Sequence, residues 1–328
     1  MHLPEPPKLE EEQNHIRMQP LVVILGPTAV GKTEVSVDLA KRFAGEIVSA
    51  DSRLLYRGMD IGTAKPTLQE RKGVTHHLID VADPDEVWSL ADFQVAARQT
   101  IDGIISRGRL PFLVGGTGQY IRAITQAWDI PKVRPDPRLR QALNKWALEI
   151  GPDALHVRLS SVDPQAAASI NSRNLRRIIR ALEVIFTTGR LFSHQRNTGF
   201  PLYDVLFLGL SRPRDELYRR VDSRIERMIE NGFVEEVRRL LDCGYSPEIP
   251  VFSAIGYLEI IAYVEGKMTL DEAVTLIKRK TRVFIRHQAN WFKPDDPQIH
   301  WFRVSHNCVD DLESIIRYWL KGAKDEKV

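Results

Sequence analysis

The segment that decides the fold is LVVILGPTAVGKT, residues 21–33. Its first five residues are apolar, as expected of a buried strand, and GPTAVGKT matches the phosphate-loop pattern GxxxxGK followed by Ser or Thr. Gly26 and Gly31 let the backbone curl so that N–H groups point inward, and the helix that follows adds partial positive charge. The segment therefore predicts a loop that binds a diphosphate or a triphosphate. Its residues are Gly26, Pro27, Thr28, Ala29, Val30, Gly31, Lys32 and Thr33.

Two side chains at the end of this loop carry much of the expected chemistry. The Lys32 ammonium can reach the outer phosphates, and the Thr33 hydroxyl can join the ligand shell of Mg²⁺. We therefore predict Mg²⁺ as the cofactor, with Thr33 as its protein ligand. The loop pattern alone does not say whose phosphates bind.

Strand-like apolar runs alternate with helical patterns along much of the chain. The expected strands cover residues 21–25, 46–50, 77–81, 110–114 and 205–210, and clear helical patterns cover 32–43 and 91–107. Such alternation indicates right-handed crossovers and a parallel sheet with helices on both faces. The sequence thus predicts an α/β fold, with a P-loop NTPase-like parallel sheet flanked by helices.

The alternation breaks at DIPKVRPDPR, residues 129–138, and resumes at VLFLGL, residues 205–210. The gap is too long for a loop, and helical patterns fill it at 139–150, 154–159 and 175–186. We therefore predict a small all-helical insertion domain. The expected organisation is a flexible tail at 1–19, a P-loop catalytic core at 20–130 and 199–312, the insertion at 131–198, and a C-terminal helix with a charged tail at 313–328.

Composition sets further limits on the class of protein. A chain of 328 residues with 43% apolar residues can bury a large core. We see neither a signal peptide nor a membrane-spanning run, and two distant cysteines, Cys243 and Cys308, favour neither disulfides nor a cysteine zinc site. We expect a monomeric cytoplasmic protein that does not bind membranes.

Asp51 follows the second expected strand, in EIVSAD. Because the carboxyl ends of parallel strands open onto one crevice, Asp51 should face the phosphate site. It could cap the next turn together with Ser52, hold Mg²⁺ through water, or accept a proton from a nucleophile. Asp80, in HLIDV, competes with it as a metal-holding aspartate.

Arginines cluster in NSRNLRRIIR, residues 171–180. In a helix Arg173, Arg176, Arg177 and Arg180 would form one stripe opposite an apolar face, with Arg140 able to extend the same surface. A solvated face explains such a stripe, and so does a polyanionic partner, which would relieve the repulsion between like charges.

A second arginine pair, Arg220 and Arg224, is four residues apart in LYRRVDSRIERMIE. This spacing can clamp a phosphate from the side opposite the loop. Asp222 and Glu226 lie on the same segment, so a surface ion-pair network is the alternative interpretation.

Six segments in order resemble one family, the tRNA dimethylallyltransferases, also called tRNA isopentenyltransferases. They are GPTAVGKT, SADSRLLYRGMDIGTAKP, HHLIDVADP, LVGGTGQY, RRIIRALEV and IGYLEI. The resemblance implies transfer of a dimethylallyl group from dimethylallyl diphosphate to the exocyclic N6 amine of adenosine 37, next to the tRNA anticodon. It also implies that the insertion grips the anticodon stem, and that the target base is extruded into a pocket.

The resemblance also implies roles for individual residues. Asp51 matches the family's general base, while Lys32, the loop amides and Mg²⁺ at Thr33 neutralise the departing diphosphate. Arg220 and Arg224 match family arginines on this helix, which favours the diphosphate clamp. The residues expected to contact tRNA are Asp51, Ser52, Arg53, Leu54, Thr117, Arg140, Arg176, Arg177 and Arg180.

The chain departs from the family pattern at a few positions. Arg173 and Asn174 stand where Asn-Asp is frequent, Leu54 where glutamine is common, and Leu258 where a basic residue is usual. These departures concern helix capping and tRNA contacts rather than the phosphate loop. Two other functions remain as alternatives: a P-loop kinase for a small molecule, and a nucleic-acid-binding module with a decayed site.

Overall fold

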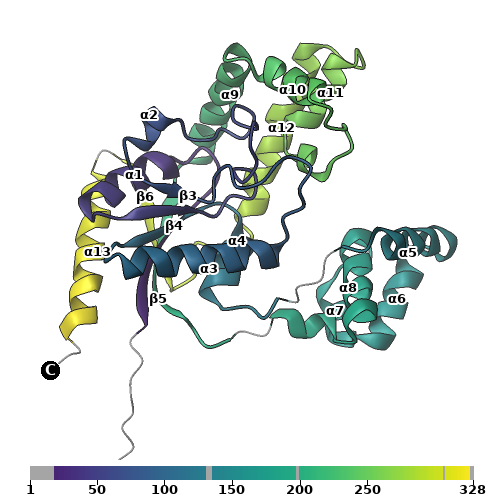
Figure 1. Ribbon diagram of the computed structural model, residues 1–328, viewed down its shortest axis with the longest axis horizontal. Coiled ribbons are helices and arrows are strands. Elements are labelled where there is room, and N and C mark those ends of the chain that lie inside the picture. The colour runs from purple at the N-terminus through teal and green to yellow at the C-terminus, as the bar shows by residue number, and fades with distance from the viewer. Residues whose placement is uncertain (1–17, 131–134, 197–198, 306, 326–328) are drawn as a thin grey trace, which may run out of the picture.

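The computed structural model describes residues 18–130, 135–196, 199–305 and 307–325 (Figure 1). Its centre is a six-stranded sheet in the order β3-β2-β4-β1-β5-β6, in which all neighbouring strands run parallel. The strands are β1 (Gln19–Leu25), β2 (Glu46–Ser49), β3 (His76–His77), β4 (Pro111–Gly115), β5 (Tyr203–Ser211) and β6 (Ile299–Arg303). The predicted α/β class is confirmed, whereas the predicted tail at 1–19 lies almost wholly outside the described residues.

Helices cover both faces of the sheet (Figure 1). α1 (Lys32–Arg42) and α13 (Cys308–Asp325) lie on one face, and α3 (Leu90–Ser106) and α4 (Gly118–Thr125) lie on the other. Strand β1 is sandwiched between these layers, and its residues 21–25 are fully buried. Central strands of a parallel sheet are typically apolar on both faces, as β1 is. The phosphate loop begins directly after this buried strand, at Gly26.

A second group of helices follows β5 and gathers at one side of the sheet (Figure 1). Its members are α9 (Arg214–Glu230), α10 (Phe233–Asp242), η2 (Pro250–Ser253), α11 (Tyr257–Val264) and α12 (Leu270–Gln288). Gly232, Gly244 and Gly266 each adopt a positive φ next to an end of one of these helices, a conformation that glycine adopts readily. The remaining helix of the part that contains the sheet is the short α2 (Leu68–Arg71), which begins with a capping box at Thr67.

Between α4 and β5 the chain forms a separate helical unit, which stands away from the sheet in Figure 1. Its helices are α5 (Pro137–Ile150), α6 (Pro152–Val162), α7 (Pro164–Ser169), α8 (Leu175–Thr188) and η1 (Phe192–Arg196). It has its own cluster of buried apolar side chains, including Leu155, Leu159 and Ile178. The fully buried Asp163 accepts hydrogen bonds from the backbone N–H of Ala166 at 2.9 Å and of Ser193 at 2.8 Å, and so ties α7 to η1.

Three elements differ from the sequence-based expectation. The strand expected at 77–81 stops after His77, because Leu78 and Asp80 both adopt φ 58°, which a strand cannot contain. Strand β6 was not predicted, because its segment IHWFR is short and carries charge. Helix α13 begins at Cys308 rather than near 313.

The described part of the chain contains neither a helix that could span a membrane nor a disulfide. None of its helices combines the length and the apolar composition needed to cross a membrane. Cys243 is exposed, Cys308 is buried, and both are free thiols.

Candidate active site

Three neighbouring strands deliver the predicted site residues to one edge of the sheet. Leu25 of β1 pairs with Gly115 of β4, and Ser49 of β2 pairs with Val114 of β4. The segments that follow these strands are the phosphate loop, the Asp51 turn and the Gly-Gly-Thr turn. Because parallel strands open onto a common crevice at their carboxyl ends, these three segments form one site.

The Asp51 and Thr117 turns are in direct contact. The N–H of Thr117 donates to the carbonyl of Ala50 at 3.4 Å, and the N–H of Ser52 donates to the Thr117 hydroxyl at 3.4 Å. Gly115 makes this approach possible, since a Cβ built there would lie 2.3 Å from the Ala50 oxygen. Thr117 therefore lies in the turn next to Asp51. This is what we expect if both residues contact the same substrate.

The phosphate loop has the curled backbone that the sequence predicts. Ala29 and Gly31 adopt φ 63° and 110°, and α1 begins at Lys32. The Lys32 ammonium folds back to donate to the carbonyls of Gly26 at 3.0 Å and Pro27 at 2.9 Å. Burial lowers the pKa of Lys32 to about 8; the carboxylate of Asp51 opposes this shift, and the positive charge of Arg224 adds to it.

Arg220 and Arg224 approach the loop from α9. The Arg220 guanidinium donates from Nε to the Ala29 carbonyl at 2.8 Å. Burial lowers the pKa of Arg224, while the nearby Asp51 carboxylate opposes that shift. Lys32, Asp51 and Arg224 therefore act on one another electrostatically, so α9 faces the phosphate loop across the site.

The acidic neighbours of these arginines are engaged elsewhere. Asp222 pairs with Arg282 at 2.5 Å, and Glu226 pairs with Lys278 at 2.6 Å. Arg282 and Lys278 both lie on α12. The alternative in which Asp222 and Glu226 neutralise Arg220 and Arg224 is therefore not what the structure contains. The positions of Arg220 and Arg224 therefore favour the interpretation in which they clamp a phosphate at the loop.

Arg212 is a further arginine at the loop that the sequence analysis missed. It follows β5, and its Nε donates to the Val30 carbonyl at 2.8 Å while its guanidinium also pairs with Glu216. Its position directly after a buried strand was the available signal, because β5 lies next to β1 and ends at the same edge.

Asp51 caps its own turn and still presents an oxygen to the site. Its Oδ1 accepts from the N–H of Arg53 at 2.9 Å, which fixes the orientation of the carboxylate. Among the described residues nothing donates to Oδ2. The capping role and a proton-accepting role are therefore compatible. The Arg53 guanidinium is held away by the Val251 carbonyl at 3.2 Å and the Ser253 hydroxyl at 3.3 Å.

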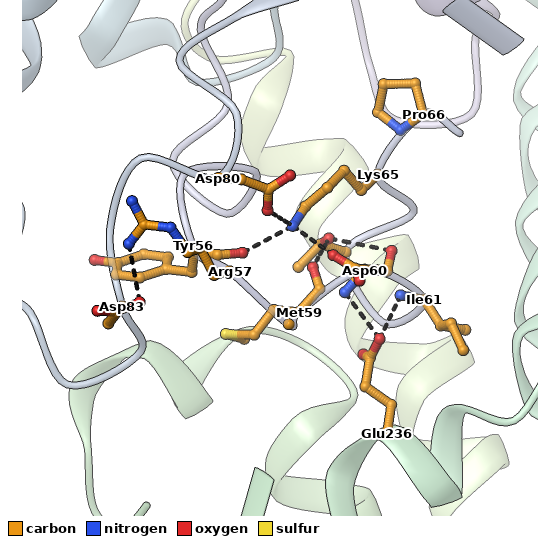
Figure 2. Close-up of polar contacts among 12 residues, drawn as sticks. Tyr56, Arg57, Met59, Asp60, Ile61, Lys65, Pro66, Asp80, Asp83 and Glu236 are labelled. Carbon is orange, nitrogen blue, oxygen red and sulfur yellow. Dashed lines mark hydrogen bonds and ion pairs between the residues drawn. The ribbon is translucent and has the colours of Figure 1, made fainter. Parts of the chain in front are cut away.

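The stretch GMDIGTAKP folds into a loop that is locked from within (Figure 2). The buried Lys65 donates to the Tyr56 carbonyl at 2.8 Å, to Asp60 Oδ1 at 2.6 Å and to Asp80. Asp80 is therefore committed to an ion pair with Lys65. This removes it as the competing metal-holding aspartate that the sequence suggested.

Glu236 of α10 holds the same loop from outside (Figure 2). Its carboxylate, 1% exposed, accepts from the N–H groups of Asp60 at 2.8 Å, Ile61 at 2.7 Å and Gly62 at 3.1 Å, and from the Tyr257 hydroxyl at 2.7 Å. No motif in the sequence marks Glu236. The signal was an acidic residue on the apolar face of a helix, in FVEEV.

A glutamine from the far end of the chain also reaches the site. Gln288, the last residue of α12, accepts at Oε1 from the N–H of Thr28 at 2.9 Å and donates from Nε2 to the Gly116 carbonyl at 3.2 Å. The side chain thus bridges the phosphate loop and the Gly-Gly-Thr turn. No sequence pattern marked it, because its partner Thr28 is 260 residues away.

The predicted arginine stripe of the insertion is wrong in part. Arg173 precedes α8 instead of joining it, and the Asn174 side chain caps the helix by accepting from the N–H of Arg177 at 3.2 Å. Capping therefore survives the departure from the family pattern. Of the remaining stripe, Arg176 is exposed and Arg177 half-buried, and neither has an ion-pair partner in the described residues.

Arg140 and Arg180 are bound to a buried carboxylate instead of standing free. Glu183, with no exposed surface, pairs with Arg140 at 2.8 Å and with Arg180 at 2.7 Å. These two predicted tRNA-contacting residues have a structural task within the insertion. The two other positions at which the chain departs from the family pattern are Leu54 and Leu258. Leu54 is half-buried and Leu258 is exposed.

The donor set at the loop suits Mg²⁺ held mainly by substrate and water. Thr33 is exposed at the start of α1, and the Asp51 carboxylate is close enough to act electrostatically on its neighbour Lys32. Among the described residues no cluster of three His, Cys, Asp or Glu side chains forms a protein cage for a metal. Mg²⁺ characteristically keeps waters and binds one or two protein oxygens plus phosphates, so the residues present fit this ion.

Comparison with known proteins identifies the relatives of this chain. The family model described as IPP transferase matches residues 54–295, and the model described as isopentenyl transferase matches residues 19–84. A tRNA dimethylallyltransferase of Thermomicrobium roseum is 50% identical over 311 residues, covering 94% of each chain. One of Roseiflexus sp. is 54% identical over 303 residues, covering 92% of this chain and 99% of its own.

Solved structures agree with the sequence relatives. The full-length tRNA isopentenylpyrophosphate transferase of Bacillus halodurans has a TM-score of 0.71 and 42% identity, with 94% of this chain and 99% of that chain covered. A eukaryotic dimethylallyltransferase, described as acting on tRNA, has a TM-score of 0.76 and 28% identity, with 92% of this chain and 77% of that chain covered. The site described above is therefore found in a chain that belongs to the tRNA dimethylallyltransferase family.

Proposed function

We propose that this protein transfers a dimethylallyl group from dimethylallyl diphosphate to the N6 amine of adenosine 37 in tRNA and releases diphosphate. Family membership supports a transferase, and the relatives are tRNA dimethylallyltransferases rather than small-molecule kinases or binding modules without activity. The observation that carries the proposal is the meeting of Lys32, Asp51 and Arg224 in one crevice. A cationic site for a leaving anion and a carboxylate for an incoming amine are what this transfer needs.

Asp51 serves as the base at the acceptor end. An adenine exocyclic amine is a poor nucleophile because its lone pair is delocalised into the ring, so proton removal must accompany bond formation. The N6–C1 bond forms as the C1–O bond of the donor breaks, and the electron pair of the broken bond leaves with the diphosphate. The amine proton passes to Asp51 Oδ2, while the Arg53 N–H holds Oδ1 in place.

The phosphate loop and α9 serve the leaving group. Lys32, Arg220 and Arg224 all lie at the phosphate loop, where together with the loop amides they would contact a bound diphosphate. Thr33 would hold Mg²⁺ together with the diphosphate oxygens. When bound, Mg²⁺ supplies positive charge that stabilises the departing diphosphate.

The insertion, within residues 131–198, is the proposed grip on the anticodon stem. Arg176 and Arg177 offer charge to the stem phosphates, while Ser52, Arg53, Leu54 and Thr117 lie near Asp51, where an extruded adenosine would be received. Asp51 would thus act both as the general base and as one of the residues that contact tRNA. One chain supplies all these groups, so we propose that the enzyme acts as a monomer in the cytoplasm.

A transfer assay tests the function. Purified protein, Mg²⁺ and an unmodified tRNA with adenosine 37 receive labelled dimethylallyl diphosphate or, separately, labelled ATP. The expected result is label on adenosine 37 from the allylic donor, with ATP inert, and no label on a tRNA with guanosine 37. Absence of transfer to any tRNA, together with turnover of ATP on a small acceptor, would return the kinase alternative.

A further inference from the structure

Helix α9 presents different faces to different neighbours. Leu217, Val221 and Ile225 form its buried face. Arg220 and Arg224, the clamp arginines, approach the phosphate loop from a second face. The place at which they meet a bound diphosphate therefore depends on how α9 is set along its own axis.

The third face of α9 makes a ladder of polar contacts with α12. The contacts of this α9–α12 ladder are Tyr218–Arg286 at 3.5 Å, Asp222–Arg282 at 2.5 Å and Glu226–Lys278 at 2.6 Å. The partners ascend by four residues along α9 and descend by four along α12, so that successive turns of two antiparallel helices meet. Arg282 also lies over the Tyr218 ring, 5.3 Å from its centroid. The α9–α12 ladder thus corresponds to one axial register of the two helices.

The central pair of the ladder is poorly arranged for stability. Asp222 and Arg282 are both partly buried, and among the described residues Asp222 Oδ1 and Arg282 Nε are buried atoms without a hydrogen-bond partner. Such unpaired polar atoms cost free energy that packed apolar side chains would not cost. Charged pairs between helices do specify register, because a slipped helix leaves its charges unpaired. Register explains this pair better than stability does.

The register of α9 matters for the site because α12 is itself fixed there. Gln288, the last residue of α12, bonds both the phosphate loop and the Gly-Gly-Thr turn. On α9, Asp222 lies midway between Arg220 and Arg224. A slip of α9 by one turn along α12 would move both arginines by about 5.4 Å, which is more than a hydrogen bond tolerates.

We propose that Asp222, through its ion pair with Arg282, is a positioning residue that sets the register of α9 and so places the clamp arginines at the phosphate loop. The inference rests on the proposed function for the diphosphate that these arginines bind. It assigns a part in donor binding to a carboxylate that points toward α12 rather than toward the phosphate loop.

The test titrates inorganic diphosphate, as its Mg²⁺ complex, into the complete protein without tRNA and follows binding by calorimetry. Asp222→Lys and Arg282→Glu each replace the attraction within the pair by repulsion. The double variant Asp222→Lys/Arg282→Glu restores the pair with its charges exchanged. Glu230→Lys, at an exposed residue one turn beyond the ladder, makes the same change of charge on α9 and is the matched control.

We expect Asp222→Lys to weaken diphosphate binding about tenfold, the value of one hydrogen bond to a charged group. The direction of the change is diagnostic, because an added lysine close to an anion site would otherwise strengthen binding. The double variant should bind diphosphate nearly as tightly as the wild-type protein, and Glu230→Lys at least as tightly. The KM for dimethylallyl diphosphate in the transfer assay should follow the same order.

A second measurement tests whether the loss runs through the clamp arginines. Arg224→Ala should weaken diphosphate binding about tenfold in the wild-type background. In the Asp222→Lys background the same change should cost less than about threefold, because the guanidinium is already out of place. A role of Asp222 in stability alone would lower the Tm without producing this coupling.

Unchanged or tighter diphosphate binding by Asp222→Lys would overturn the inference, and so would a double variant that binds no better than either single variant. Equal losses from Arg224→Ala in both backgrounds would also overturn it. If Asp222→Lys does not fold, Asp222→Asn replaces it, with an expected loss of about threefold from the missing charge, and an unchanged affinity would then be decisive against the inference. Failure of the wild-type protein to modify tRNA would count against the proposed function alone, since diphosphate binding is measured without tRNA.

Discussion

Arg140 and Glu183 form a two-point ion pair that joins α5 to α8: Nε lies 2.8 Å from Oε1, and Nη2 lies 2.9 Å from Oε2. The same carboxylate accepts from Arg180 and from the N–H of Asp136. Burial alone would raise the pKa of Glu183, but the hydrogen bonds from Arg140 and Arg180 outweigh it and lower the pKa. The four arginines of the insertion that were predicted to contact tRNA thus divide into a structural pair, Arg140 and Arg180, and a pair without an ion-pair partner in the described residues, Arg176 and Arg177.

Replacing Glu183 should destabilise the insertion. Glu183→Ala should lower the free energy of unfolding by about 1–3 kcal/mol, below the full value for a broken buried pair because both arginines are partly exposed and can hydrate. Glu149→Ala, at an exposed position of the same unit, should change little. Because the pKa of Glu183 is lowered, its contribution exists above the ordinary glutamate pKa and is lost as the pH falls through the lowered value. Thermal unfolding followed by circular dichroism across acidic pH measures both effects.

Arg176 and Arg177 should govern the salt dependence of tRNA binding. Arg176→Ala and Arg177→Ala should each remove one phosphate interaction and so reduce the slope of log K against log salt by about one unit. Arg140→Ala should lower the Tm while changing the slope less, since Arg140 is engaged by Glu183. Equal slopes in wild type and Arg176→Ala would return these arginines to the role of a solvated face.

Asp51→Asn should separate binding from turnover. The amide keeps the size of the side chain and its acceptor for the Arg53 N–H, but it cannot accept the amine proton. We expect kcat to fall by about 10²–10⁴, with tRNA and donor affinities within a few-fold of wild type. Single-turnover transfer and equilibrium binding are the measurements, and parallel losses in both would contradict the assignment of Asp51 as the base.

The lowered pKa of Lys32 predicts how the kcat/KM for dimethylallyl diphosphate depends on pH. Because burial lowers its pKa to about 8, the ammonium is charged below this pH and neutral above it in the ligand-free protein. The kcat/KM for dimethylallyl diphosphate should therefore decline as the pH rises through about 8. Lys32→Arg keeps its charge throughout this range, so its profile should lack the decline even where its rate is lower. An identical decline in both proteins would assign it to another group.

Glu236 should control the order of the loop drawn in Figure 2. Glu236→Gln presents one acceptor oxygen where the carboxylate has two, so at least one of the Asp60, Ile61 and Gly62 N–H groups loses its partner. Hydrogen exchange at these amides should accelerate, and the Tm should fall. Glu235→Gln, its exposed neighbour, should leave both unchanged. Unaltered exchange in Glu236→Gln would mean that the loop holds itself through Lys65.

The sequence predicted the parts of the fold that depend on local patterns. A buried strand followed by GPTAVGKT has few alternatives, and the alternation of apolar and helical segments indicated the parallel sheet. The long gap without alternation indicated the helical insertion for the same reason. β3 and β6 were harder: β3 ends early because Leu78 and Asp80 adopt a positive φ that no local pattern announces, and the segment of β6 is short and carries charge.

The site was predictable only as far as its motifs extend. Asp51, Lys32 and Thr117 follow predicted strands, so topology alone brings them together. Gln288 and Glu236 lie on helices far from the motifs, and nothing in their own segments reveals which backbone amides they meet. Arg140 and Arg180 looked like free charges because the burial of Glu183 is a property of the packed unit.

The two chain segments that join the insertion to the core meet where the N–H of Gly199 donates to the Ala127 carbonyl at 3.1 Å. From the core's side the insertion is therefore a closed loop, and the entropy of closing such a loop grows only with the logarithm of its length. Shortening it to a few glycines should cost the core little. A core so reduced should still fold and bind diphosphate while losing its hold on tRNA, which would make donor recognition and tRNA recognition separable modules of one chain.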